Sequence, residues 1–266
     1  MALITTEAIA LKSLRWGEAD RIVTFFSYKL GKVRGIARGA RKMKSRFGGA
    51  LEPFTCVNLT LFDKRHDSLG SISHVDILES FASLREDLGR MSAAARMVSL
   101  VEGITADRDP SHTLFRTLRE GLRALRASED HALTTILFQI HVLTLAGFRP
   151  QIDHCASCGQ DFGSRIPRFS PSAGGLLCQS CDQASWDSCL PMSPGSVAFM
   201  QQARRLRFAL ALRLKAAGQV RRELEDIIDA YARAIVGTRL PAMNFLAAEP
   251  SPVYGTVDDH SVMERM

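Results

Sequence analysis

The chain has 266 residues, of which 46% are hydrophobic, so it can bury a sizeable core and is not expected to be disordered. Lysine and arginine total 34 against 28 aspartate and glutamate, a net charge of +6 that mildly favours an anionic partner. No apolar run approaches the roughly 18 residues that a membrane span needs, and Glu7 interrupts the first apolar stretch, so neither a membrane protein nor a secretory signal is expected.

Residues 1–80 are expected to form a small β-barrel. Strand-like runs, separated by turn-rich or polar pieces, lie at residues 6–14, 21–26, 32–37, 55–62 and 71–78. Short strands at this spacing predict a small antiparallel barrel or sandwich. A five-stranded barrel of the OB type is one solution, and periodicity alone does not choose it over an SH3-like barrel.

Beyond residue 80 the period becomes helical. Apolar side chains recur at helical spacing in four segments, 91–101, 114–125, 133–143 and 220–235. Asp109–Ser111 predicts a break followed by a helix start, and Gly147 followed by Pro150 predicts the end of the third helix.

The predicted architecture is therefore α+β and multidomain. Residues 1–80 form the barrel, and residues 81–150 and 191–248 form a helical domain. Residues 151–190 are an insertion between the helices. The last segment, 249–266, contains prolines and acidic residues and is expected to be a weakly ordered acidic tail.

Four cysteines form a pattern typical of a structural zinc site. Cys155 and Cys158 make one C-x2-C pair, Cys178 and Cys181 make a second, and residues 159–177 separate the pairs. Each pair can point two thiolates at one ion from a tight turn, and two pairs complete the tetrahedron that zinc prefers. Because four sulfurs leave no position for an activated water, we expect one structural zinc ion.

Other interpretations of the cysteines fit less well. We expect a cytoplasmic protein, in which clustered thiols more often bind metal than form disulfides. A redox dithiol of the thioredoxin type would require one pair to open a helix within a βαβ unit, and neither pair has that setting. His154 adjoins a ligand and is expected to face away, while Cys56 and Cys189 are expected to be core or bystander residues.

Residues 29–46 form a basic segment without any acidic residue. In its strand-like part, Lys32 and Arg34 share one face at period two with Arg38, and the cations continue into an expected loop. Such a row can follow a phosphate backbone and bind it in a salt-sensitive way. The alternative is a solvated face. Nearby aromatic candidates for base stacking are Phe25, Phe26, Tyr28 and Phe47.

Several motifs lie in a characteristic order along the chain and carry a resemblance that extends over about residues 2–245. They are Gly17–Val23, Gly31–Arg41, Ser45–Gly48, Leu51–Phe54 and Leu145–Pro150, the last leading into the first cysteine pair. With these motifs the sequence resembles the RecO family of DNA recombination-repair proteins.

The resemblance implies an N-terminal OB fold, a helical C-terminal domain and a zinc-binding module inserted among the helices. Members bind single- and double-stranded DNA, anneal complementary strands and, with RecR, help RecA replace the single-stranded DNA-binding protein SSB. We therefore expect a non-enzymatic mediator in the cytoplasm, at the nucleoid, with DNA, RecR and the C-terminal tail of SSB as partners. RecF and RecA would be engaged indirectly, and no membrane is involved.

The resemblance also suggests site residues. By position, DNA contact falls to the basic motif: Lys32, Arg34, Arg38, Arg41, Lys42 and Lys44. Glu18, Asp20 and Arg21 match as well and are expected to order a turn. The family's pocket for the acidic, Phe-ended SSB tail lies in the helical domain. The candidates here, which could equally be core plus solvated face, are Phe115, Leu118, Arg119 and Leu122.

Two other classes of function were weighed against the mediator. A zinc-containing nucleic-acid-modifying enzyme is disfavoured because the sequence has no P-loop, no H-E-x-x-H, no deaminase signature and no G-x-S-x-G. A protein-interaction adaptor would touch DNA only through its partners, and a mobility shift with the purified chain distinguishes it from the mediator.

Overall fold

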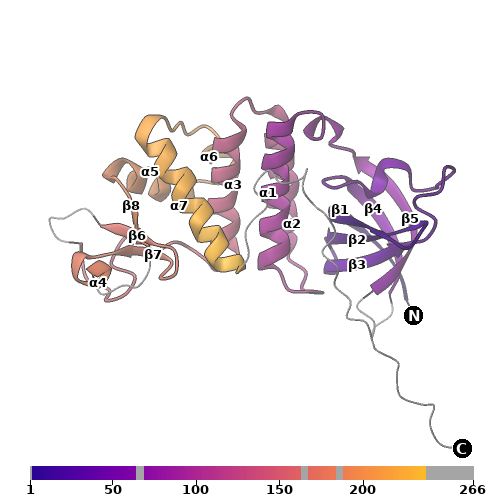
Figure 1. The fold of residues 1–266 in the computed structure, drawn as a ribbon, viewed down its shortest axis with the longest axis horizontal. Helices are drawn as coiled ribbons and strands as arrows, with labels where there is room; N and C mark the ends of the chain where they lie inside the picture. The colour runs from indigo at the N-terminus through magenta and orange to yellow at the C-terminus, as the bar shows by residue number, and fades with distance from the viewer. Residues whose placement is uncertain (1, 64–68, 163–166, 184–187, 238–266) are drawn as a thin grey trace, which may run out of the picture.

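The computed structural model describes residues 2–63, 69–162, 167–183 and 188–237. The predicted acidic tail, 249–266, lies outside the described residues. Figure 1 shows an elongated molecule with a β-barrel at one end, helices in the middle and a small sheet at the other end. Within the described part of the chain, no helix has the length and apolar character needed to cross a membrane.

Five strands close into the N-terminal barrel in the order β1-β2-β3-β5-β4. Their bounds are β1 Ala2–Trp16, β2 Asp20–Ser27, β3 Gly31–Ala37, β4 Cys56–Asp63 and β5 Leu69–Glu79. Strands β3 and β5 pair in parallel, and the other neighbours pair antiparallel. This order confirms the five-stranded OB-type barrel and removes the SH3-like alternative.

Strand β1 closes the barrel because it serves two neighbours. Its first half pairs with β4 from Ala2 to Ile9, and its second half pairs with β2 as far as Trp16. Ala8 and Ile9 pair on both sides, and a bulge between Ala10 and Lys12 lies within the pairing with β2. An extra residue of this kind bends and twists a strand, which lets one continuous segment turn the corner of a barrel.

The two faces of the barrel wall have different partners. Phe25 points inward to a core that includes Val23 and Leu59, whereas Phe26 points outward and joins the helical core. Both rings are fully buried. The outer face of the barrel therefore provides a docking surface for the helices as well as a solvent-facing wall.

A helical domain follows the barrel. Short 3-10 helices, η1 Gly48–Leu51 and η2 Ala82–Leu84, lie in the barrel segment and just after it. The α-helices are α1 Leu88–Ile104, α2 His112–Ala127, α3 His131–Leu145, α4 Gln179–Gln183, α5 Pro194–Arg205, α6 Phe208–Ala211 and α7 Gly218–Val236. Helix α3 is buried along most of its length between α1, α2, α5 and α7.

Side-chain caps fix where the main helices begin. Asp87 accepts a hydrogen bond from the third residue of α1, and Ser111 and Asp130 do the same for α2 and α3. Such caps satisfy N–H groups that have no partner inside the helix. The helix start predicted at Asp109–Ser111 is confirmed by α2, which begins at His112. Helix α3 ends at Leu145, and Gly147 follows it with a positive φ of 87°.

A three-stranded sheet is inserted between α3 and α5. It contains β6 Arg168–Ser170, β7 Gly175–Leu177 and β8 Leu190–Pro191, in the order β7-β6-β8. The Phe169 ring packs edge-on against Tyr231 of α7, with ring centroids 5.5 Å apart. The insertion is therefore anchored to the helical domain through α7.

The barrel and the helices are joined by a charged and aromatic interface. Arg119 of α2 donates to Glu7 of β1 at 2.8 Å and to Glu79 of β5 at 2.7 Å. The Tyr28 ring stacks on His112 with centroids 4.1 Å apart. Hydrogen bonds from Arg123 and Arg119 hold the pKa of Glu79 below its usual range, so this carboxylate stays charged at the interface.

The structure corrects the predicted partner pocket on α2. Phe115, Leu118 and Leu122 are fully or almost fully buried in the main core, and Arg119 is engaged at the domain interface. The amphipathic pattern reflects packing against the other helices and the barrel. The three apolar side chains therefore take the alternative role, that of core.

Candidate metal site and nucleic-acid interface

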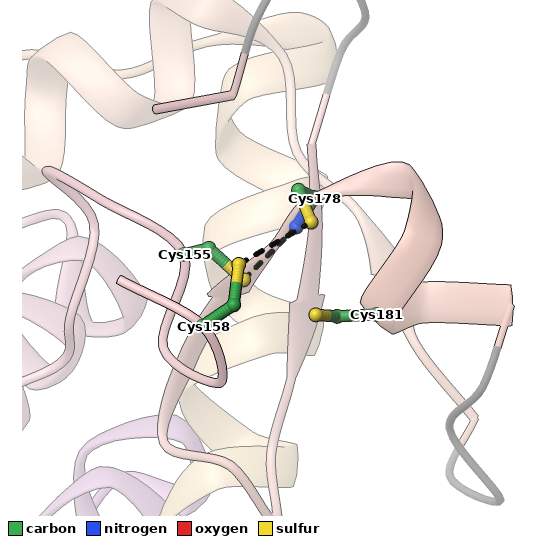
Figure 2. Close-up of side chains that lie close together, drawn as sticks. All are labelled: Cys155, Cys158, Cys178 and Cys181. Carbon is green, nitrogen blue, oxygen red and sulfur yellow. Dashed lines mark hydrogen bonds between the residues drawn. The ribbon is translucent and has the colours of Figure 1, made fainter. Parts of the chain in front are cut away.

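The four predicted cysteines come together at the small sheet. Cys155 and Cys158 lie in the loop after α3, and Cys178 and Cys181 lie at the junction of β7 and α4, as Figure 2 shows. Their sulfur atoms all lie within 4.8 Å of one another, and the sulfurs of Cys158 and Cys178 are 3.8 Å apart. Metal–sulfur bonds of about 2.3 Å in a tetrahedron place sulfurs about 3.8 Å apart. The four thiols can therefore hold one metal ion.

Backbone hydrogen bonds shape the first knuckle around Cys155. The N–H of Gly159 donates to the carbonyl of Cys155 at 2.9 Å, which closes a turn that Gly159 completes at a φ of 73°. The N–H of Ala156 donates to Leu176 at 2.7 Å and holds this turn against β7. A Cβ on Gly175 would lie 2.3 Å from the Gln151 carbonyl oxygen, so only glycine allows the approach.

The thiols differ in acidity. Burial raises the pKa of Cys155, but backbone N–H groups of Cys158, Cys178 and Ser157 donate to its sulfur and bring the pKa to about 6. Ser157 also donates to Cys181, yet the sulfurs of Cys178 and Cys158 raise the pKa of Cys181 to about 12. One sulfur thus ionises readily while its neighbours resist further negative charge, a repulsion that a bound divalent cation offsets.

The neighbours of the cluster agree with the sequence prediction. The His154 ring lies 2.9 Å from an Asp161 carboxylate oxygen and does not join the four sulfurs. Cys189 is buried beside the cluster without belonging to it. Cys56 is buried in the barrel wall, and this burial raises the pKa of its thiol to about 11.

The basic segment divides into two parts, the first of which is tied to the helices. Lys32 donates to the carbonyls of Glu102 and Thr105 at 2.9 and 2.6 Å, and its side chain is only 15% exposed. Arg34 donates to Asp107 at 2.8 Å, and Lys32 lies 3.4 Å from the same carboxylate. These two predicted DNA-contacting residues instead anchor the barrel to the segment after α1.

The Asp107 carboxylate, which pairs with Lys32 and Arg34, was not predicted from the sequence. Desolvation raises the pKa of Asp107, but the hydrogen bond from Arg34 and the charge of Lys32 lower it below its usual range. Asp107 lies far from β3 in the sequence and belongs to no recognised motif. Only the docking of the two domains reveals that it neutralises part of the basic segment.

The second part of the segment is a loop, residues 38–46, that is pinned to the turn between β1 and β2. The N–H of Gly39 donates to the Asp20 carboxylate at 2.7 Å. The Arg41 guanidinium donates to the carbonyls of Gly17 and Glu18 at 3.2 and 3.0 Å. The Asp20 carboxylate and the backbone carbonyls of Gly17 and Glu18 thus tie the β1–β2 turn to the basic loop, whereas Arg21 pairs with Glu52 at 2.7 Å.

Four cations of the loop face solvent. Arg38, Lys42, Lys44 and Arg46 are exposed, and among the described residues no carboxylate forms an ion pair with any of them. Arg46 lies over the Phe47 ring at 4.9 Å. Uncompensated like charges held on one loop raise the local positive potential, which attracts polyanions.

A cavity of about 470 Å³ opens between α1, α3 and α7. Its lining includes Arg96, His131, Ile136 and Gln139, together with Asp130 and Glu225, which are both hydrogen-bonded to Arg221. Gln139 is almost fully buried, yet its amide nitrogen has no hydrogen-bond acceptor among the described residues. The same holds for Nε of Arg96. Both atoms are enclosed by protein, so they are buried polar groups next to the cavity and not donors open to it.

Comparisons with known proteins cover nearly the whole chain. Residues 1–81 match the family model described as Recombination protein O N terminal, and residues 85–243 match the one described as Recombination protein O C terminal. A DNA repair protein RecO from Rubrobacter xylanophilus is 36% identical over 248 residues, covering 93% of this chain and 96% of that protein.

Two further relatives carry the same name. The protein from Anaeromyxobacter dehalogenans is 32% identical over 255 residues, covering 96% of this chain and 100% of the relative. The protein from Geobacter metallireducens is 38% identical over 176 residues, covering 66% of this chain and 71% of the relative.

Proposed function

The chain belongs to the RecO family of DNA repair proteins, and from this we propose that it is a non-enzymatic recombination mediator that binds DNA through loop 38–46. The observation that carries the proposal is a set of exposed cations, which form no ion pair with the described part of the chain, on a loop that is fixed to the barrel: Arg38, Lys42, Lys44 and Arg46. Phosphate groups match such a set, and binding of this type requires no base sequence.

The proposed mediator acts on both single- and double-stranded DNA. By neutralising phosphates it allows complementary strands to approach, which promotes annealing. With RecR it promotes loading of RecA onto SSB-coated single strands during gap and break repair. Family membership and the exposed cations support this role, and it places the protein at the nucleoid.

For the four-cysteine cluster we propose one zinc ion. Cys155, Cys158, Cys178 and Cys181 supply four sulfurs at spacings that fit tetrahedral coordination. Zinc would add a cross-link between the loop after α3 and the β7–α4 junction, which already meet through backbone hydrogen bonds of Gln151 and Ala156 with residues 174–176. Because the sulfurs fill the coordination sphere, its role is to stabilise the insertion.

As part of this proposal we place the SSB tail in the cavity between α1, α3 and α7. An acidic peptide that ends in phenylalanine needs donors for its carboxylates and an apolar wall for its ring. The cavity is lined by Arg96, whose guanidinium also donates to Asp229, by Gln139 and by the apolar side chain of Ile136. Replacing Gln139 with leucine should weaken binding of such a peptide, whereas a peptide without the terminal phenylalanine should bind weakly to both proteins.

The decisive experiment is annealing of complementary, SSB-coated oligonucleotides by the purified chain. The wild type should accelerate annealing, and a variant with alanine at Arg38, Lys42 and Lys44 should not. A control with alanine at Arg205, Arg213 and Lys215 removes the same charge from exposed positions elsewhere and should anneal normally. A wild type that shifts no DNA in a mobility assay would instead indicate an adaptor that reaches DNA through its partners.

A further inference from the structure

The outer face of the β1–β2–β3 ribbon is built from rows of side chains that cross the strands. Pairing places Phe26 between Ile9 and Lys32, Thr24 between Lys12 and Arg34, and Ile22 between Leu14 and Ile36. Trp16 pairs with Asp20 at the open end of the ribbon. Side chains in alternate rows of a sheet share a face, so these rows form one continuous outer surface.

The helical domain covers only one half of this surface. The row with Phe26 and Lys32 is buried against α1 and α2, and Arg34 in the next row is held by Asp107. The other half stays open, with Leu14 50% exposed and Trp16 48% exposed. The exposed Leu14 and Trp16, next to the half-buried Ile22 and Ile36, form an apolar patch, and such patches often mark binding sites.

The basic loop 38–46 is fastened directly beside this open half. Arg41 and Gly39 bond to residues 17–20, the turn that immediately follows Trp16. Arg38 follows the end of β3, so its backbone lies about two strand spacings, roughly 10 Å, from that of Trp16. The same hydrogen bonds that order the loop therefore set cations and an aromatic ring side by side.

We propose that the open half of the ribbon is a platform for the bases of single-stranded DNA, with Trp16 as the stacking residue and Leu14, Ile22 and Ile36 as its apolar floor. This inference rests on the proposed function, because the loop cations must first bind the phosphates. Aromatic side chains next to a positive groove are the usual means by which OB-type barrels hold unpaired bases without reading their sequence.

The charges around the platform favour nucleic acid over an apolar protein partner. Arg38 follows β3 at the edge of the platform, and Lys42, Lys44 and Arg46 belong to the same loop; none of the four has a carboxylate partner among the described residues. The nearest acidic side chain in register, Asp20, is occupied by the Gly39 N–H. A strand can thus place its phosphates on the loop while its bases turn toward the ribbon. Duplex DNA, whose bases are stacked internally, would use only the loop.

The test distinguishes contacts with bases from contacts with phosphates. In a Trp186→Phe protein, Trp16 is the only tryptophan, so its fluorescence reports stacking directly. Oligothymidylate of about 15 nucleotides should quench this emission, whereas an abasic oligomer of equal length should not. In the otherwise wild-type chain, Trp16→Ala should weaken oligothymidylate binding at least about 5-fold and leave abasic binding unchanged, and Trp16→Phe should restore most of the affinity.

Phe62→Ala is the matched control, because Phe62 is an exposed aromatic on β4, outside the ribbon. It should bind both oligomers like wild type, and thermal unfolding should show that each variant is folded. Equal loss of both oligomers by Trp16→Ala, or unquenched Trp16 emission with full affinity, would overturn the platform while leaving phosphate binding intact. If the wild type bound neither oligomer, the proposed function would fail, and the platform with it.

Discussion

The salt dependence of single-stranded DNA binding offers a quantitative test of loop 38–46. Each phosphate neutralised on a single strand contributes about 0.7 to the slope of log K against log salt. Contacts from Arg38, Lys42, Lys44 and Arg46 therefore predict a slope near −2.8, or an affinity loss of about 50-fold between 50 and 200 mM salt. Alanine at the first three positions should leave a slope near −0.7 and a loss of about 2.6-fold.

The choice of residues follows from their contacts. Arg41 is left in place because it holds the β1–β2 turn, and Lys32 and Arg34 are left because Asp107 engages them. Fluorescence anisotropy of a labelled oligothymidylate at several salt concentrations measures the slope. The alanine variant at Arg205, Arg213 and Lys215, the control in the annealing assay, changes the net charge equally and should keep the wild-type slope. Direct contact between loop 38–46 and the phosphates would be refuted if the wild type and the loop variant had the same slope. It would also be refuted if the control variant flattened the slope as much as the loop variant does.

Three further predictions concern stability and charge. Metal analysis should find about one zinc per chain, and serine at Cys155 and Cys178 should lower both zinc content and melting temperature; an unchanged melting temperature would make the cluster dispensable to the fold. Asp107→Asn should weaken domain docking by up to about 1 kcal/mol in urea unfolding and steepen the salt slope, because it frees Arg34 while Lys32 stays bound to the Glu102 and Thr105 carbonyls; an unaltered slope would contradict the sequestration of Arg34. Burial opposes ionisation of Glu223, but hydrogen bonds from Ser193 and Ser196 lower its pKa to about 2. Since this pKa lies below the unfolded value of about 4.3, the stability it contributes is present above pH 4.3 and is lost toward pH 2. Glu223→Gln should lower the free energy of unfolding by about 1 to 3 kcal/mol at neutral pH and reduce its dependence on pH in the acid range. Urea unfolding at pH 7 and pH 3 measures both effects, and a variant as stable as the wild type at pH 7 would contradict the prediction.

Local pattern was enough to predict the strands and the metal ligands. The alternation of apolar residues located the barrel strands to within a few residues, since each strand buries one face. The two C-x2-C pairs identified the four cysteines that the fold gathers into one cluster, because a tight turn already brings both sulfurs of a pair to one side. In both cases the physical cause acts over a few residues, so the sequence displays it directly.

The partner pocket on α2 shows where local pattern fails. Phe115 and Leu118 lie on an amphipathic helix, and the same spacing would arise for an exposed groove or for a core. The distinction depends on what the apolar face meets in space. Here it meets the other helices and Phe26 of the barrel, so the face is core.

The sequence by itself determined the five N-terminal strands, the helical domain, the four cysteines that cluster and the concentration of cations in residues 29–46, whereas the strand order that closes the barrel came from the structure. The tertiary structure alone decided which of those cations are free, because Asp107 reaches Lys32 and Arg34 only when the domains dock. It also brought the basic loop to the turn beside Trp16, through hydrogen bonds between segments apart in the sequence. Electrostatic pairing depends on distance in space, and a linear pattern of charges does not contain that distance.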